Sequence, residues 1–173
     1  MANNHTAGTA ARTFAPSELC QRMLAKTSKG TCGPCILYLE DGTIFYGRAC
    51  GAEGTATGEV CFNTSLEGYF EVMTDPSYAG QIVTMTYPQI GNYGIDETDV
   101  QSAFPGDTAR PASAPAMRGM IVRDMCATPS NWRSAVSVPE CLRAHGIVAI
   151  EGVDTRALVR HLRDNGSKMG IRS

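Results

Sequence analysis

The sequence predicts an α/β domain in which strands dominate and the helices are short and lie late in the chain. Three observations lead to this prediction. An Asp-Gly pair separates two runs of β-branched and aromatic residues, which is typical of a β-hairpin. Further runs of the same kind recur through the chain, and one amphipathic helix stands near its end. With 173 residues, 43% of them hydrophobic, the chain is long enough for one domain with a sizeable core.

The predicted hairpin comes first. The runs 36–39 and 43–47 flank Asp41-Gly42, and glycine accepts the positive φ of a tight turn. A glycine-rich loop follows over residues 51–58 and leads into a strand over 59–64. This loop lacks the Lys-Ser/Thr pair of a P-loop and is followed by a strand instead of a helix. We therefore interpret it as a turn and not as a phosphate site.

The middle of the chain predicts a short helix, then a strand. Leu66, Tyr69, Phe70 and Met73 recur at spacings of three or four, and Asp75-Pro76 ends the helix because the residue before proline avoids the helical region. Residues 81–87 are then expected to form a strand. The proline-rich segment 92–118 has no periodicity and is expected to be a loop, followed by a short strand over 120–122.

The last third predicts two helices around a buried strand. The first helix is expected over 139–144, and the strand over 147–150. The clearest helix of the chain is expected over 154–165, where Asp154 caps the first turn, Leu158 and Leu162 form an apolar stripe, and Gly166 ends the helix. Val153 and Leu158 have the spacing of a hydrophobic staple.

Composition excludes several classes of function. The net charge is −2, which gives the chain no electrostatic reason to bind nucleic acid or an anionic membrane surface. No apolar run approaches the roughly 18 residues of a membrane-spanning helix. Seven cysteines are an odd number and no secretory signal precedes them, so we expect reduced thiols in the cytoplasm.

Residues 1–34 differ from the rest of the chain. They carry four basic residues and one acidic residue, a net charge of 4 − 1 = +3, whereas the remainder has 11 − 16 = −5. We expect a disordered N-terminal extension, because chain termini are loose unless they dock. A targeting segment with a short helix after Ser17 remains an alternative.

Cys32-Gly33-Pro34-Cys35 has the residues of a thioredoxin-like redox motif. That chemistry requires the first thiol at a helix N-terminus directly after a core strand. Here the motif follows a polar tail and leads into a strand, so a thiol oxidoreductase is a minor hypothesis. A zinc site is also disfavoured, because no second ligand pair follows at finger-like spacing.

Two other groups of reactive residues lie on predicted helices. Cys141 and His145 are four residues apart and have the spacing of a metal-binding or thiolate–imidazole pair, but a packed cysteine and a helix-terminal histidine are the simpler interpretation. His161 lies among three arginines, Arg156, Arg160 and Arg163. Such a cluster is usually a solvated face, although one side of it could meet an acidic partner.

From about Cys35 to its end, the sequence strongly resembles the N-terminal domain of the carbamoyl-phosphate synthase small subunit. The resemblance rests on segments that occur in the same order in that family. They are Leu39-Glu40-Asp41-Gly42-Thr43, Gly58-Glu59-Val60-Cys61-Phe62-Asn63-Thr64-Ser65, Gly68-Tyr69, Thr74-Asp75-Pro76-Ser77-Tyr78, Gln81-Ile82-Val83, Thr86-Tyr87-Pro88, Ile90-Gly91-Asn92-Tyr93-Gly94 and Val153-Asp154-Thr155-Arg156.

The resemblance implies that residues 35–173 form a swivelling β/β/α three-layer domain. It implies a part in a heterodimeric ligase of arginine or pyrimidine biosynthesis, in which the small subunit hydrolyses glutamine. The large subunit then uses the ammonia, bicarbonate and two ATP, with Mg²⁺, to make carbamoyl phosphate. The expected partners are the large subunit, the glutaminase domain and glutamine, and Ser77 is expected to help bind glutamine. The alternative for Ser77 is an ordinary turn hydrogen bond.

Two departures from the family pattern matter. Residues 101–116 suggest a surface insertion rich in proline and alanine. More importantly, family glutaminases use a Gly-x-Cys-x-Gly elbow and a His-x-Glu pair. No cysteine here has that flanking pattern, and His5, His145 and His161 are not followed by Glu two residues later.

We therefore expect a chain without the glutaminase domain. It should be inactive alone, with no catalytic residue, metal or cofactor of its own. A stand-alone binding or regulatory module derived from the same domain is the alternative hypothesis.

Overall fold

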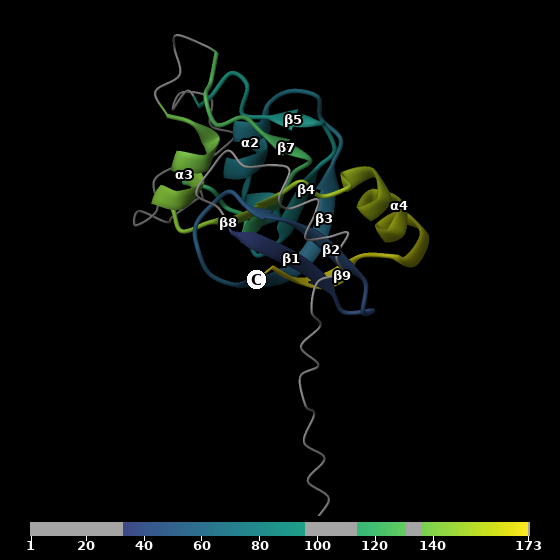
Figure 1. Cartoon of the computed structure of the whole chain (residues 1–173). Helices are drawn as coiled ribbons and strands as arrows, with labels where there is room; N and C mark the ends of the chain where they lie inside the picture. The colour runs from purple at the N-terminus through teal and green to yellow at the C-terminus, as the bar shows by residue number, and fades with distance from the viewer. Residues whose placement is uncertain (1–32, 96–113, 131–135, 173) are drawn as a thin grey trace, which may run out of the picture.

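The computed structural model describes residues 33–95, 114–130 and 136–172 (Figure 1). Nearly all of the expected N-terminal extension over 1–34, including Cys32, lies outside the described residues. So does most of the expected loop over 92–118 with its insertion. The predictions made for those segments therefore stay predictions.

The described elements are short strands with a few short helices between them. In chain order they are β1 (Pro34–Leu39), β2 (Ile44–Ala49), β3 (Ala56–Asn63), α2 (Tyr69–Thr74), the 3₁₀ turn η1 (Pro76–Tyr78), β4 (Ile82–Met85), β5 (Gln89–Ile90), β6 (Gly119–Ile121), β7 (Asp124–Met125), α3 (Val138–Ala144), β8 (Val148–Glu151), α4 (Thr155–Asn165) and β9 (Lys168–Arg172).

Seven of these strands close into a barrel in the order β1-β2-β8-β6-β4-β3-β9. β9 completes the ring, since it pairs antiparallel with both β1 and β3. β3, β4, β6 and β8 are mutually parallel, so their carboxyl ends meet at one end of the barrel, which we call the carboxyl rim. The chain leaves β8 at this rim and immediately forms α4.

Two hydrophobic clusters lie on the two faces of the barrel wall. Successive side chains of a strand point to opposite faces. In β4, accordingly, Ile82 packs in one cluster while Val83 and Met85 pack in the other. The first cluster also contains Leu158 and Leu162 of α4. The second contains side chains of α2 and α3, which lie on a different side of the barrel from α4 (Figure 1).

The predicted α/β class, dominated by strands, is confirmed, and so is the β-hairpin at Asp41-Gly42. The specific swivelling three-layer type stays a prediction. Asp154 caps α4 as expected, because its Oδ1 accepts a hydrogen bond of 3.0 Å from the Ala157 amide. Gly166 ends α4 with a φ of 80°.

Two of the differences from the sequence prediction concern α2 and β9. Leu66 does not belong to the helix: it is 72% exposed, because α2 begins only at Tyr69, after Gly68 turns the chain with a φ of 74°. The strand β9 was not predicted from the sequence. It is short and contains Gly170, where a side chain would collide with Val60 of the neighbouring strand. In the parts of the chain that the structure describes, no helix combines the length and apolarity required to cross a membrane.

Candidate functional site

Ser77 lies on the exposed side of the turn η1, between α2 and β4. Asp75 caps this turn, and its Oδ1 accepts a hydrogen bond of 2.8 Å from the Ser77 amide. The backbone amides of Tyr78 and Ala79 donate to the carbonyl oxygens of Asp75 and Pro76. The turn is therefore held by the Asp75 carboxylate and by backbone groups. The Ser77 hydroxyl makes no hydrogen bond to the described residues, so it is not needed to hold the turn.

A groove of about 320 Å³ runs along α2 beside this turn. We call it the α2 groove. It is lined by Asn63, Ser65, Glu67, Gly68, Glu71, Val72, Asp75 and Tyr78. Asn63 makes hydrogen bonds to two other residues of the lining. Its Nδ2 donates to the Tyr78 hydroxyl over 2.9 Å, and its Oδ1 accepts from the Ser65 amide over 2.7 Å.

A larger hollow of about 740 Å³ adjoins the α2 groove and shares Glu67, Gly68 and Glu71 with it. Its wall contains a stacked pair of rings, Tyr69 and Tyr93, whose centroids are 4.2 Å apart. The Tyr69 hydroxyl donates to the Gly94 carbonyl over 2.6 Å, and the Tyr93 hydroxyl accepts from the Gly68 amide over 2.9 Å. Burial raises the pKa of both phenols, so both rings stay uncharged at neutral pH.

The side chains at this surface can bind a ligand through charge and hydrogen bonds. Glu67, Glu71 and Asp75 bring three carboxylates to the α2 groove, and carboxylates favour a cationic group such as an ammonium. The nearby Ser77 hydroxyl can both donate and accept. The α2 groove therefore favours a ligand with a cationic group, and the Ser77 hydroxyl on the adjoining turn is available for a hydrogen bond.

Neither Cys61 nor Cys35 has the surroundings of an activated nucleophile. Burial raises the pKa of the Cys61 thiol to about 11, which keeps it protonated at neutral pH. Cys35 is buried in β1, so it lies in a strand and not at a helix terminus. Within the described segments, no group of three or more His, Cys, Asp or Glu side chains could hold a metal ion.

Cys141 and His145 are close but are not arranged as a catalytic pair. The Cys141 Sγ lies 3.7 Å from Nδ1 of His145, and the same Nδ1 lies 2.9 Å from the Cys141 carbonyl oxygen. A carbonyl oxygen only accepts, so Nδ1 carries the proton and donates it. It cannot at the same time take a proton from the thiol. His145 therefore satisfies the carboxyl end of α3, in agreement with the simpler interpretation of the sequence.

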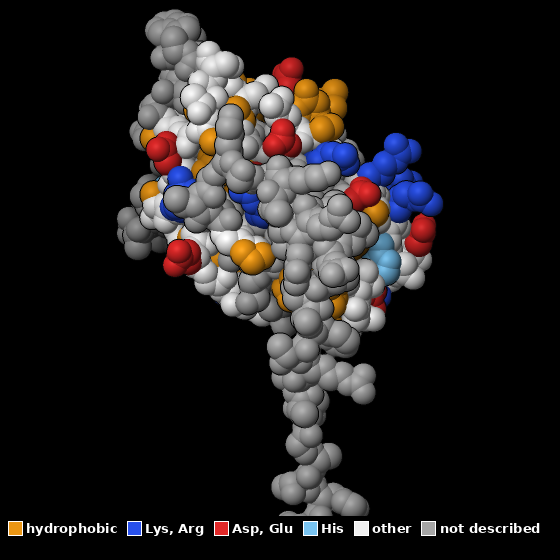
Figure 2. All heavy atoms as spheres, viewed as in Figure 1, with side chains coloured by type: hydrophobic (Ala, Val, Ile, Leu, Met, Phe, Trp, Pro, Cys, Tyr) orange, Lys and Arg blue, Asp and Glu red, His pale blue; other side chains and the backbone are white. Residues whose placement is uncertain are grey.

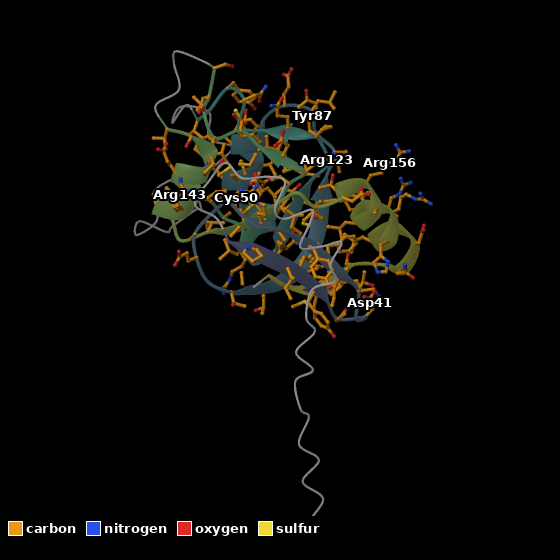
Figure 3. The ribbon with its side chains drawn as sticks, in the orientation of Figure 1. Asp41, Cys50, Tyr87, Arg123, Arg143 and Arg156 are labelled. Atoms are coloured by element: carbon orange, nitrogen blue, oxygen red, sulfur yellow. The ribbon has the colours of Figure 1, made fainter. Side chains whose placement is uncertain are left out.

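A second groove, of about 580 Å³, lies at the carboxyl rim beside α4. We call it the rim groove. It is lined by Thr64, Thr86, Pro88, Arg123, Thr155, Arg156, Val159, Arg160 and Arg163. Figure 3 shows Arg123, Arg156 and Tyr87 on this side of the molecule, with Arg143 on the other side, on α3. His161 is not part of the groove lining, because its Nε2 lies 2.7 Å from Oδ2 of Asp41 in the β1–β2 turn.

Comparison with known proteins identifies the family of this architecture. Residues 37–171 match the family model described as "Carbamoyl-phosphate synthase small chain, CPSase domain". This chain belongs to the carbamoyl-phosphate synthase small-chain family. The family resemblance drawn from the sequence is thereby confirmed.

Curated members of the family are close relatives. The carbamoyl phosphate synthase small chain of Syntrophotalea carbinolica is 54% identical over 136 residues, which cover 79% of this chain and 34% of the relative. The small chain of Xanthomonas axonopodis pv. citri is 54% identical over 137 residues, covering 79% and 32%. This chain thus spans about a third of the length of the family members it matches.

Solved structures give weaker matches than these family sequences. An aminopeptidase from Aneurinibacillus sp. strain AM-1 aligns with a TM-score of 0.44 and 16% identity, over 82% of this chain and 32% of that one.

Several residues that line these grooves were not predicted from the sequence. The Tyr69–Tyr93 stack joins α2 to the segment after β5, and nothing in the local pattern predicts that contact. Thr64, Thr86 and Arg123 of the rim groove come after three different strands. A prediction that these strands are parallel could have placed the three residues together, because the carboxyl ends of parallel strands meet at one edge.

Proposed function

We propose that this chain is the N-terminal structural and docking domain of the small subunit of glutamine-hydrolysing carbamoyl-phosphate synthase. The observation that carries the proposal is the family match over residues 37–171. In the complete enzyme the small subunit releases ammonia from glutamine. The large subunit combines this ammonia with bicarbonate at the expense of two ATP, with Mg²⁺, for arginine or pyrimidine biosynthesis. This domain holds no cofactor of its own in that scheme.

Ser77 is the residue through which the domain contributes to glutamine recognition. Its hydroxyl is exposed, and the turn that carries it is fixed by Asp75 and by backbone hydrogen bonds. A group held in this way loses little conformational freedom on binding. It reaches from this domain toward glutamine bound on the glutaminase domain, and the carboxylates of the α2 groove favour the ligand's ammonium.

The domain supplies recognition and not chemistry. Burial keeps the Cys61 thiol protonated, Nδ1 of His145 donates to a carbonyl oxygen at the end of α3, and His161 contacts Asp41. Glutamine hydrolysis is then the work of the family's glutaminase domain. Loss of the Ser77 hydroxyl should weaken use of glutamine and leave use of free ammonia intact.

The experiment is Ser77→Ala in the full-length small subunit, assembled with its large subunit. Carbamoyl phosphate formation is measured with glutamine and, separately, with ammonium chloride. We expect kcat/KM for glutamine to fall about 10-fold, the effect of losing one hydrogen bond of about 1.5 kcal/mol. The rate with saturating ammonia should stay unchanged.

Ser167→Ala is the matched control, because Ser167 is also exposed but lies in the loop between α4 and β9. It should change neither rate. If Ser77→Ala leaves the glutamine kinetics intact, Ser77 does not bind glutamine. If both rates fall in parallel, the serine supports assembly instead of recognition.

A further inference from the structure

The rim groove collects basic side chains through the topology of the barrel. Thr64 directly follows β3, Thr86 directly follows β4, and Arg123 lies two residues after β6, so residues beyond the ends of three parallel strands meet in one place. α4 forms the opposite wall. Figure 2 shows Lys and Arg side chains gathered where Figure 1 places α4. In folds built on parallel strands, closed barrels included, ligands commonly bind beside the carboxyl ends of the strands.

Three arginines form a row on one face of α4. Arg156, Arg160 and Arg163 are spaced at i, i+4 and i+7, which places them on the same side of a helix. Seven residues at 1.5 Å each give the row a length of about 10 Å. With Arg123, these are four guanidinium groups, and none of them makes a hydrogen bond or ion pair with the residues that the structure describes.

The groove is not built for a single compact anion. A phosphate at a helix N-terminus needs free backbone amides. Here the Ala157 amide donates to Asp154, and the Thr155 amide donates to the Val153 carbonyl. The Asp154 carboxylate also repels an anion at this end of α4. The remaining attraction comes from guanidinium groups spread over about 10 Å, a spacing that suits several separate carboxylates.

We propose that the rim groove is the docking surface for an acidic segment of the large subunit, with at least two carboxylates about 10 Å apart. This inference rests on the proposed function. Arginine pairs with carboxylates through two parallel hydrogen bonds, and the threonines add hydroxyl donors. Pro88 and Val159 supply apolar contacts between the charged positions.

Two observations favour a separate chain as the occupant. The rim groove shares no lining residue with the α2 groove, so it stays available when the Ser77 side faces the glutaminase domain. β9 runs antiparallel to β3 and therefore leads the chain away from the carboxyl rim.

The charge of the groove indicates the chemistry of the partner. Residues 35–173 have a net charge of −5, so this basic groove is a local exception that matches an acidic partner.

The test is charge reversal in the full-length small subunit, measured as the Kd for the purified large subunit. We expect Arg156→Glu/Arg160→Glu to raise Kd at least 10-fold in 50 mM salt, with a smaller difference in 500 mM salt because salt screens exposed charges. Arg143→Glu is the matched control, since Arg143 is exposed on α3, away from α4 (Figure 3). It should leave Kd unchanged. The neutral pair Arg156→Gln/Arg160→Gln should show a smaller loss and guards against misfolding of the reversed variant.

Several outcomes would overturn this assignment. If neither the Glu pair nor the Gln pair changes Kd, the large subunit does not bind in the rim groove. Equal losses for Arg143→Glu indicate general charge repulsion. Faster proteolysis of the reversed small subunit before the large subunit is added places the glutaminase domain there. Inorganic phosphate that raises the Tm of the unmodified chain, but not of the reversed variant, assigns a phosphate ligand. The wild-type Kd is measured first, so absence of any complex signals failure of the proposed function itself.

Discussion

At the scale of single residues, Asp41 connects the first hairpin to α4. Its Oδ1 accepts from the Thr43 amide over 3.0 Å, and its Oδ2 lies 2.7 Å from Nε2 of His161. The Thr43 backbone hydrogen bond first, and His161 second, lower the pKa of the Asp41 carboxyl from 3.8 to about 2. One side chain thus serves both a local turn and a contact 120 residues away in the sequence.

Acid titration should detect these two contacts separately. Because the folded pKa lies below the unfolded value, the stabilisation by Asp41 is complete above about pH 4 and is lost as the pH falls through about 2. Replacing His161 with Ala should raise the pKa of Asp41 only part of the way to 3.8, because the larger contribution from Thr43 remains. The carboxyl carbon chemical shift, followed by NMR between pH 1 and 6, measures both values. A return to 3.8 in His161→Ala would contradict the leading part assigned to Thr43.

Gly47 shows how closely strands approach in the barrel wall. A side chain at this position of β2 would meet the Glu151 carbonyl oxygen and Cγ1 of Ile150, the latter at 2.6 Å. Gly33→Ala is the matched control, because nothing lies within 4 Å of a side chain there. We expect Gly47→Ala to lower the free energy of unfolding by about 2 kcal/mol, as overpacked sites do, and Gly33→Ala to leave it nearly unchanged. Urea denaturation compares them, and equal stabilities would show that the β2–β8 contact is looser than described.

At the scale of elements, the ends of the helices follow rules of local chemistry. Ser137 and Glu140 form a capping box at the start of α3: the Glu140 amide donates to the Ser137 hydroxyl, and Glu140 Oε2 accepts from the Ser137 amide over 3.1 Å. The Ser-x-x-Glu spacing was readable in the sequence, but the sequence prediction began this helix at Pro139 and overlooked it.

Removing this cap should destabilise the chain measurably. Ser137→Ala takes away the hydroxyl that Glu140 contacts at 2.7 Å, and we expect a loss of about 1 kcal/mol in the free energy of unfolding. Ser137→Thr keeps a hydroxyl and should recover most of that loss. The measurement is thermal or urea unfolding followed by circular dichroism. A full loss in both variants would mean that packing around the buried Ser137, and not the hydrogen bond, is responsible.

Elements defined by their own residues could be predicted, and elements defined by distant neighbours could not. The Asp41-Gly42 turn, the stop at Asp75-Pro76 and the Asp154 cap each depend on a few adjacent residues, and the structure has all three. β9 and the two-residue strands β5 and β7 are stabilised by pairing with remote strands. Their own sequences, with Gly170 in one case, carry little strand signal.

At the scale of the whole molecule, closure of the barrel decides where the surfaces lie. The sequence predicted most of the strands but not their order, and the order brings the ends of β3, β4 and β6 to the groove beside α4. Ser77 was proposed as a glutamine-binding residue through the family resemblance alone. Its exposure and the Asp75 cap that frees its hydroxyl became visible only in three dimensions.

The central claim is that this domain presents Ser77 to glutamine in the assembled synthase. The most direct measurement is the alkylation rate of a cysteine at that position, read by mass spectrometry of the peptide, in the complete enzyme carrying Ser77→Cys. Ser167→Cys is labelled in parallel as an exposed control. We predict that saturating glutamine slows labelling at position 77 at least 10-fold and leaves position 167 unchanged. Equal labelling of position 77 with and without glutamine would contradict the claim.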